Sequence, residues 1–459
     1  MQLSPKDTVR VDLATGHKHA LRPIKAGENV IKYGFPIGHA TCDIAEGEWV
    51  HSHNLATNLS GTLEYTYTPI ESPLPGAEST RTFMGYLRPD GSVGIRNDVW
   101  IVNTVGCVNN TARILAEKTG ALHFPHPFGC SQLGDDQAFT QAILKGMVNH
   151  PNAGGVLVLG LGCENNNLEV FKAVLGETDP NRVKFLNCQD VSDEIEEGCR
   201  LIKELQDYAA TFTRTPQSIS KLKAGLKCGG SDGYSGITAN PVVGRFSDLL
   251  VAEGGASVLT EVPEMFGAEQ LLMDRAINEE VFRKTVSLIN DFKDYFTRHN
   301  QVVYENPSPG NKAGGITTLE EKSLGCVQKG GLSTVMDVLK VGEPIPGSGL
   351  YLLDGPGNDL VAMTNLMAAG CQVILFTTGR GNPAGAPVPT VKISTNTALA
   401  QKKHGWIDFD AGVLLEDPDL DKHGNALLSY VLQVAEGTET CAEKNGYREI
   451  SIFKDGVTL

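Results

Sequence analysis

Long hydrophobic runs and an excess of positive charge are both missing from this chain. No apolar stretch in its 459 residues approaches membrane-spanning length, and the opening residues MQLSPKDTVRVDL lack a basic-then-apolar targeting pattern. Its 39 lysines and arginines are outnumbered by 54 aspartates and glutamates, for a formal net charge of −15. Nucleic acids and anionic membranes attract local positive potential, so neither is an expected partner. We expect a cytoplasmic protein.

Two kinds of cofactor or cross-link motif are absent as well. None of the ten cysteines forms a CxxC pair, and no GxxxxGK[ST] or GxGxxG occurs between a strand and a helix. Nucleotide binding therefore has no support. In a large chain without a secretory signal, the cysteines are expected to be reduced thiols.

What is present is a glycine-rich chain, with 51 glycines, that is too long for one hydrophobic core. Residues 10–60 contain short β-type runs and two similar turns, IKAGE and DIAEGE, which predict a compact β-clip. Residues 66–82 are rich in Pro, Ser and Glu without apolar periodicity and predict a linker.

From residue 83 the pattern changes to apolar strands alternating with helices. Residues 97–107 and 154–164 read as buried strands, and residues 111–120 and 137–151 as helices. Strands that are apolar on both faces suit parallel sheets covered by helices, and the alternation repeats in the C-terminal half. The prediction is an α/β protein with a small N-terminal β domain (1–65), a linker (66–82) and two α/β domains with mainly parallel sheets (83–215 and 216–459).

Polar, glycine-rich loops follow four of the apolar strands: VNTVGCVNN, VLGLGCENNN, LTEVPE and LFTTGRGNP. Ligands of parallel sheets bind just beyond the carboxyl ends of the strands, where loops converge. Each loop alone has an ordinary structural explanation, but their shared position predicts a polar active site. Residues 306–331 lack helix or strand periodicity and read as a long functional loop.

The stretch GEWVHSHN raises a separate question. Alternation through Trp49 reads as a strand end, where His51 and His53 share one face. Two imidazoles on one face can hold a divalent metal, polarise a substrate or simply occupy a wet sheet edge. Spacing alone leaves these alternatives open.

Long segments of the chain resemble the altronate/galactarate dehydratase family. They include GHKHALRPIKAGENVIKYGFPIGHA, GEWVHSHN, FGCSQLGDD, CGGSDGYSGITANPVVGRFSD and ENPSPGNKAGGITTLEEKSLGCVQKGG, and they run through nearly the whole chain. The resemblance implies an N-terminal SAF-type domain and conversion of a sugar acid, D-altronate, to 2-keto-3-deoxy-D-gluconate and water, with Fe²⁺ or Mn²⁺. Family members usually carry a further strand before GHKHAL, so a shortened first domain is expected. A homo-oligomer is expected only from base rates.

The implied reaction explains which residue types are needed. Removal of the weakly acidic C2 proton creates charge that a Lewis-acid metal stabilises, while a base and an acid serve C2 and the C3 hydroxyl. On this basis the predicted metal ligands are His51, His53, Glu164 and Asp232, and the predicted catalytic residues are His51, His53, Lys312 and Glu261. The predicted substrate-binding residues are Asn54, Asn103, Ser131, Gln132, Ser231, Asn311, Arg380 and Lys392.

Several alternatives remain at this level. One is a [4Fe–4S] cluster with an open iron, held by cysteines from predicted loops, although local cysteine spacing is lacking. Others keep the fold and change the substrate, to galactarate dehydratase or a sulfolactate sulfo-lyase-like activity. A sugar-acid-binding protein without turnover ranks last. The cysteines considered for the cluster are Cys107, Cys163, Cys228 and Cys326.

Overall fold

Six short strands in two antiparallel sheets form the N-terminal domain of the computed structural model, which describes residues 1–77 and 79–456. The predicted pair of similar turns is real: Gly27 and Gly47 both take a positive φ, near 80°. Ile24 and Ile44 bridge the two sheets. One sheet contains β1 (Val9–Val11), β2 (Lys18–Ala20) and β5 (Trp49–Val50), and the other β3 (Asn29–Lys32), β4 (Phe35–Ala40) and β6 (Leu55–Ala56).

The segment after this domain, residues 57–77 and 79–81, contains no helix or strand. It lies along the C-terminal α/β unit, where the Tyr65 hydroxyl donates to Glu269 at 2.5 Å and the Tyr67 hydroxyl to the Ala276 carbonyl at 3.0 Å. The linker is therefore anchored to the surface that it crosses.

The middle unit is built on a four-stranded parallel sheet in the order β10-β9-β11-β12. The strands are β9 (Asp98–Asn103), β10 (Leu122–His123), β11 (Ala153–Gly160) and β12 (Val183–Asn187). Its helices are α1 (Asn109–Thr119), α2 (Gly134–Val148), α3 (Leu168–Leu175) and α4 (Glu194–Ala209). A small antiparallel sheet of β7 (Thr82–Leu87), β8 (Val93–Gly94) and β13 (Thr215–Ser218) joins this unit to the next.

The C-terminal unit has a seven-stranded parallel sheet in the order β16-β17-β15-β14-β18-β19-β20. Its strands are β14 (Lys223–Cys228), β15 (Ala256–Leu259), β16 (Val335–Leu339), β17 (Gly349–Leu353), β18 (Val373–Thr378), β19 (Thr390–Ser394) and β20 (Phe409–Asp410). The helices that follow are α5 (Ala239–Ala252), α6 (Gln270–Met273), α7 (Glu279–Arg298), α8 (Pro309–Ala313), α9 (Leu319–Cys326), α10 (Asp359–Ala368), α11 (Thr397–Lys402), α12 (Leu420–Ala435) and α13 (Cys441–Lys444). The predicted fold class is confirmed.

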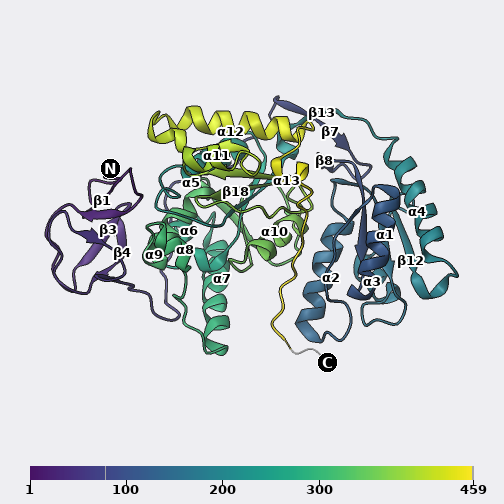
Figure 1. Cartoon of the computed structure of the whole chain (residues 1–459), viewed down its shortest axis with the longest axis horizontal. Helices are drawn as coiled ribbons and strands as arrows, with labels where there is room; N and C mark the ends of the chain where they lie inside the picture. Colours follow the sequence, from purple (N-terminus) through teal and green to yellow (C-terminus); the bar gives the residue numbers. More distant parts are fainter. Residues whose placement is uncertain (78, 457–459) are drawn as a thin grey trace.

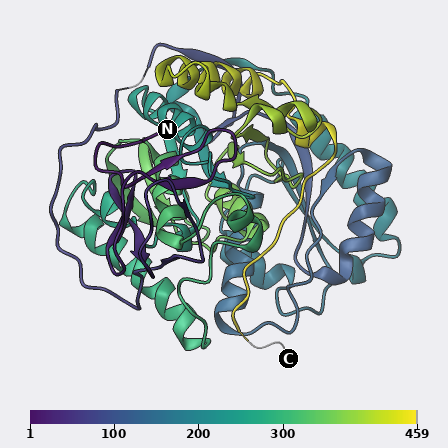
Figure 2. The same ribbon diagram turned by 60° about the vertical axis from the view of Figure 1, so that its left-hand side comes forward.

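The two α/β units lie side by side, with the N-terminal domain against the C-terminal unit on its other side (Figures 1 and 2). Helix α10 packs on α2, and Gly146 permits the close approach because a Cβ there would lie 2.4 Å from the Ala368 carbonyl oxygen. The C-terminal segment then passes between the units, and Asp136 accepts hydrogen bonds from the backbone of Asp455 at 2.7 Å and Gly456 at 2.9 Å.

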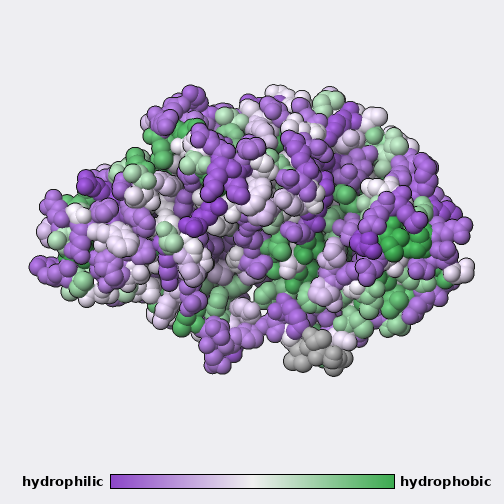
Figure 3. Space-filling model, in the orientation of Figure 1, coloured by the Kyte–Doolittle hydropathy of each residue, from purple (hydrophilic) through white to green (hydrophobic). Residues whose placement is uncertain are grey.

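One face of the molecule is mainly hydrophilic. Hydrophilic residues cover most of the face seen in Figure 3. Among residues 1–77 and 79–456, no helix is long and apolar enough to cross a membrane.

The expectation of an irregular loop at residues 306–331 is wrong. This segment forms α8, α9 and a 3₁₀ turn, η5 (Val327–Gly330). Every residue of α9 is buried, including its charged ones. A helix surrounded on all sides has no polar face, so the amphipathic period that marks a helix in sequence is missing.

Buried charges on α9 fasten the N-terminal domain to the C-terminal unit. Glu321 accepts from Lys18 Nζ and Lys32 Nζ, each at 2.8 Å, and all three side chains are at most 2% exposed. Burial opposes ionisation of Glu321, yet the two ammonium groups hold its pKa down at about 2. A carboxylate with two buried cationic partners is costly to remove alone, because both partners would be left uncompensated.

We predict that Glu321→Gln lowers the free energy of unfolding by about 3–5 kcal/mol, the cost of breaking a buried ion pair. The check is urea denaturation of the variant and the parent chain. Because the Glu321 carboxyl has a lowered pKa, its stabilisation is complete above pH 4.5 and is lost as the pH falls toward 2. The difference between variant and parent should therefore shrink across that acid range.

Asp43→Asn provides the matched control in the same domain. Asp43 pairs with Lys25 at 2.8 Å, but the side chains are 63% and 76% exposed. Solvent screens such a pair, so this variant should unfold like the parent. Equal effects of the two substitutions would show that the Glu321 triad does not fasten the domains.

Candidate functional site

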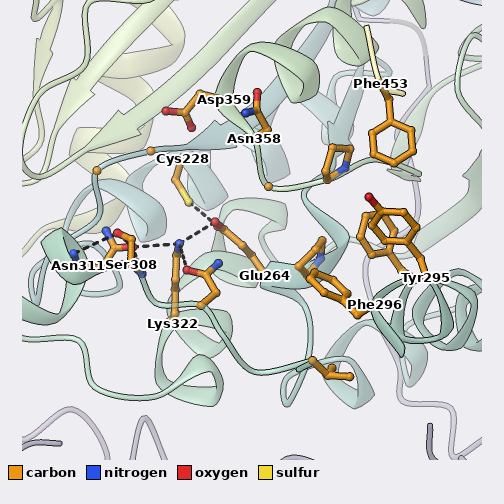
Figure 4. A pocket seen from close by; sticks show the side chains of 18 residues that line it. Cys228, Glu264, Tyr295, Phe296, Ser308, Asn311, Lys322, Asn358, Asp359 and Phe453 are labelled. Carbon is orange, nitrogen blue, oxygen red and sulfur yellow. Dashed lines mark hydrogen bonds and ion pairs between the residues drawn. The ribbon is translucent and has the colours of Figure 1, made fainter. Parts of the chain in front are cut away.

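A cavity of about 560 Å³ lies beyond the carboxyl ends of β14, β15 and β17 (Figure 4). Helix α7 and the C-terminal segment close one side with aromatic rings, and α9 with the segment before it closes another. The lining combines apolar walls with a few polar groups, as small-molecule sites do. Its polar side chains are Cys228, Glu264, Tyr295, Asn306, Ser308, Asn311, Lys322, Asn358 and Asp359.

Two residues of the cavity lining, Cys228 and Glu264, meet the thiol of Cys326, which lies outside the lining. Cys228 ends β14, Glu264 lies in the 3₁₀ turn η4 (Val262–Glu264), and Cys326 ends α9. The Cys228 and Cys326 sulfur atoms are 3.4 Å apart and lie 3.0 and 3.1 Å from Glu264 Oε2. All three residues are buried, and within the described chain they form the only group of three His, Cys, Asp or Glu residues close enough to share one ion.

Three lysines surround the group. Lys322 Nζ lies 2.8 Å from Glu264 Oε1 and also donates to Asn306 and Asn311, at 3.1 and 3.3 Å. Lys329 Nζ lies 3.1 Å from Cys228 Sγ. Burial works against ionisation of Glu264, but Lys322, Lys329 and Lys227 bring its pKa to about 2. The carboxylate is therefore charged throughout the physiological range.

A second layer of ion pairs holds these lysines. Lys227 Nζ lies 2.7 Å from Glu261 and 2.6 Å from Asp359. Glu261 also accepts from the Cys228 backbone at 2.9 Å and adopts a left-handed backbone with φ of 70°. Such a backbone is strained for a residue with a side chain and marks a constrained site. Glu261, predicted to be catalytic, lies behind the cavity lining and positions Cys228.

The donor set fits a divalent metal ion. Three carboxylates (Glu261, Glu264 and Asp359) balance the three lysines while both thiols are protonated. Hydrogen bonding to Cys228, together with burial, raises the pKa of the Cys326 thiol. Exchange of two thiol protons for one divalent ion leaves the net charge unchanged. Two sulfur donors suit iron better than manganese, which prefers oxygen ligands.

The expectation that His51 and His53 share a strand face is wrong. Strand β5 ends at Val50, and the Asn54 side chain closes a turn by accepting from the His51 backbone at 2.9 Å and donating to the Trp49 carbonyl at 3.0 Å. His51 is buried against the Lys312 carbonyl, 2.9 Å from its Nε2, whereas His53 is exposed beside the Trp49 ring. Both rings flank Trp49, with ring centres 4.9 and 5.1 Å from that of the indole, but only His51 is buried.

Glu164 and three predicted substrate-binding residues lie in the middle unit. The Glu164 carboxylate accepts from Thr104 Oγ1, Leu161 N and Gly162 N at 2.6, 3.0 and 2.7 Å, so it binds two loops together. The other three make local contacts of the same kind: Asn103 donates to Asn109, the Ser131 backbone donates to Asn165, and Gln132 accepts from Gly129 and Thr140.

The remaining predicted residues lie in the C-terminal unit. Asp232 is buried and accepts from Thr395 Oγ1 at 2.9 Å and Asn396 Nδ2 at 3.2 Å. Asn311 donates to the Ser231 carbonyl at 2.9 Å and is the one predicted site residue that lines the cavity. Lys312 is half-buried outside the lining, and Arg380 is exposed.

Lys392 is buried within the sheet. Its Nζ has no hydrogen-bond partner and lies 3.5 Å from the centre of the Phe376 ring. Burial, together with the nearby Lys227, lowers the pKa of Lys392 to about 7. Lys392 lies outside the cavity lining.

Sequence reasoning missed Glu264, Lys322 and Asp359 as site residues. The position of Glu264 after an apolar strand did indicate a site residue. An acid at that position also fits the first turn of a helix, however. Cys228 and Cys326 were considered only as cluster ligands, together with Cys107 and Cys163. The structure divides that set, placing Cys228 and Cys326 in the C-terminal unit and the other two on loops of the middle unit.

Comparison with known families covers almost the whole chain. Residues 4–58 match the altronate/galactarate dehydratase SAF domain. Residues 85–210 match the D-galactarate dehydratase/altronate hydrolase second domain, and residues 219–458 match the D-galactarate/altronate dehydratase C-terminal domain.

Similar curated proteins agree with these matches. The chain is 56% identical to altronate dehydratase of Bacillus subtilis (strain 168), over 98% of this chain and 93% of that protein. It is 54% identical to altronate dehydratase of Escherichia coli (strain K12), over 98% and 94%. Galactarate dehydratase (L-threo-forming) of Escherichia coli (strain K12) is 33% identical, over 95% and 89%. The chain therefore belongs to the altronate/galactarate dehydratase family of hydro-lyases.

Proposed function

We propose that this chain converts D-altronate to 2-keto-3-deoxy-D-gluconate and water in the 560 Å³ cavity. The observation that carries the proposal is the buried Cys228–Glu264–Cys326 group beside Lys322, at the carboxyl ends of parallel strands. The higher identity to altronate dehydratases than to galactarate dehydratase favours altronate as the substrate.

Fe²⁺ is the metal that we propose for this group, with Cys228 and Cys326 as thiolates and Glu264 as the oxygen donor. When bound, a divalent ion supplies Lewis-acid stabilisation for the charge that develops on the substrate carboxylate as the C2 proton leaves. Lys329 Nζ donates a hydrogen bond to Cys228 Sγ at 3.1 Å and so holds this side chain in the group.

Lys322 is placed to bind the substrate carboxylate. It is the one lysine in the cavity lining, and Asn306 and Asn311 hold its Nζ in position. Ser308 and the two asparagines offer neutral hydrogen-bonding groups of the kind that hydroxyls of a sugar acid require.

Asp359 is the residue that we propose as the base. The cavity lining contains two carboxylates, and Glu264 is already committed to two thiols and Lys322. The Asp359 side chain is 31% exposed and is oriented by Lys227 and Asn382, both at 2.6 Å. Asp359 removes the C2 proton, the C3 hydroxyl departs, and the two leave as water. The enol that remains tautomerises to the keto acid.

We predict that the chain forms a 2-keto acid from D-altronate, loses this activity on treatment with a chelator, and regains it with Fe²⁺. Cys228→Ser and Cys326→Ser should weaken Fe²⁺ retention, because a hydroxyl is a poorer ligand than a thiolate for this ion. Activity is measured as keto-acid formation and retention as bound iron after desalting. Full turnover in the chelated, metal-free chain would overturn the metal assignment, and galactarate as the better substrate would overturn the altronate assignment.

Asp359→Asn should lower kcat roughly a hundred- to ten-thousand-fold, the usual cost of losing a general base, with a smaller change in KM. Steady-state kinetics on D-altronate supply the measurement.

Asp337→Asn is the matched control for this substitution. The Asp337 side chain is 33% exposed and pairs with Lys284 at 2.9 Å, but it lies outside the cavity lining. Its kcat should equal that of the parent chain. If Asp359→Asn keeps the parental kcat as well, the base lies elsewhere.

A further inference from the structure

Three cysteines of the middle unit lie at the carboxyl end of its sheet and have no part in the proposed function. Cys107 comes after β9, Cys130 precedes α2, and Cys163 comes after β11. Each follows a glycine in the sequence, and each is exposed with a free thiol. Because parallel strands end at one edge of a sheet, the loops that carry these thiols share one edge.

Direct contacts bind the three loops together. Gly106, next to Cys107, donates its backbone N–H to the Phe128 carbonyl at 2.8 Å. Gly129, next to Cys130, accepts from the Asn166 backbone at 3.0 Å. Ser131, on the other side of Cys130, donates to Asn165 Oδ1 at 2.8 Å. Residues adjacent to each cysteine, or two to three positions away, thus touch a neighbouring cysteine loop.

Two further features fix this arrangement. A Cβ on Gly129 would lie 2.0 Å from the Thr104 carbonyl oxygen, so only glycine lets the loops with Cys130 and Cys107 approach so closely. The buried Glu164 carboxylate accepts hydrogen bonds from Thr104 and from the backbone of Gly162, which flanks Cys163. The cysteine backbones are thereby held without any contribution from the thiols themselves.

The three thiols are not grouped around a single point. Within the described chain, no group of three ligands besides Cys228, Glu264 and Cys326 is close enough to share one ion. The exposed cysteines are thus spaced too widely for one metal ion. In an iron–sulfur cluster each thiolate binds a different iron, so the sulfur ligands lie further apart than ligands of one ion do.

Three helices begin close to this edge of the sheet. Helices α1, α2 and α3 begin at Asn109, Gly134 and Leu168, shortly after the three cysteines. The amino ends of helices carry partial positive charge, which suits a bound anionic cluster.

None of the three cysteines lines the cavity of the proposed active site, but the loop with Cys130 leads toward it. The loop with Cys130 continues into Asp135 and Phe139, which line a second cavity of about 280 Å³. This cavity shares Phe292, Tyr295, Pro356 and Phe453 with the first one.

We propose that Cys107, Cys130 and Cys163 hold a [4Fe–4S] cluster through three thiolates, and that its fourth iron takes a ligand from outside this triad. Loading from a preformed cluster is a ligand exchange. Three cysteine thiols bind three irons, and three small-molecule thiolates leave as thiols with the cysteine protons. No electron is transferred in this step.

The test uses the full chain, freed of metal and incubated without oxygen with a synthetic [4Fe–4S] cluster that carries small thiolate ligands. After gel filtration the parent chain should retain about four irons and four sulfides, with the brown colour and visible absorption of the cluster. Cys107→Ser, Cys130→Ser and Cys163→Ser should each lose most of that iron and sulfide. Thermal unfolding of the metal-free variants checks that each is folded, which the exposure of these thiols leads us to expect.

Two control variants separate this site from the rest of the chain. Cys42→Ser removes another exposed thiol, in the N-terminal domain, and should retain the cluster. Cys228→Ser alters the buried group and should also retain it, whatever it does to turnover. A parent chain that retains no sulfide would overturn the proposal. So would a cluster that survives loss of any triad cysteine, or one that is lost with Cys228 instead.

Discussion

The burial of helix α9 is the constraint on which the rest of this structure depends. All of its residues are buried, yet it carries Glu320, Glu321 and Lys322 in succession. A buried charge is tolerated only with a partner, and the partners come from separate parts of the chain. Glu321 takes two lysines of the N-terminal domain, and Lys322 takes Glu264 from the end of another strand. The helix therefore couples the attachment of that domain to the assembly of the cavity.

The same requirement explains why three lysines surround the buried group of Cys228, Glu264 and Cys326 although the chain is acidic. Lys227, Lys322 and Lys329 are each matched to a carboxylate that is itself buried or partly buried. A network of this kind is a poor source of stability, because desolvation offsets most of the attraction between its members. What the network does is fix the positions of the groups that it contains. The thiols of Cys228 and Cys326 are held against a carboxylate in a pocket whose charge is already balanced, so a divalent ion can replace two protons there without leaving an excess of either sign.

Local patterns predicted most of the fold and little of the site. Strands such as β11 and β18 are buried at every position and appear in the sequence as continuous apolar runs, which is why the parallel sheets were predictable. Helix α9 gave no such signal because a helix without a polar face has no amphipathic period. The prediction that His51 and His53 share a strand face failed for a different reason. The side chain of Asn54 closes a turn, so the strand ends before His51. Cys228 and Cys326 are 98 positions apart, and only the packing of α9 against the end of β14 brings them together.

The cysteines of the two α/β units lie in different environments, because each set lies at the end of a different sheet. Cys228 and Cys326 are enclosed by lysines and a carboxylate, and the pKa of Cys326 is raised, so its thiol keeps its proton until a cation replaces it. The thiols at the edge of the middle sheet are exposed, and helices α1, α2 and α3 begin shortly after them. Phe453 lines both cavities, and the backbone N–H of Asp455, two residues later, donates a hydrogen bond to Asp136. The C-terminal segment therefore connects the walls of both cavities to the first turn of α2 in the middle unit.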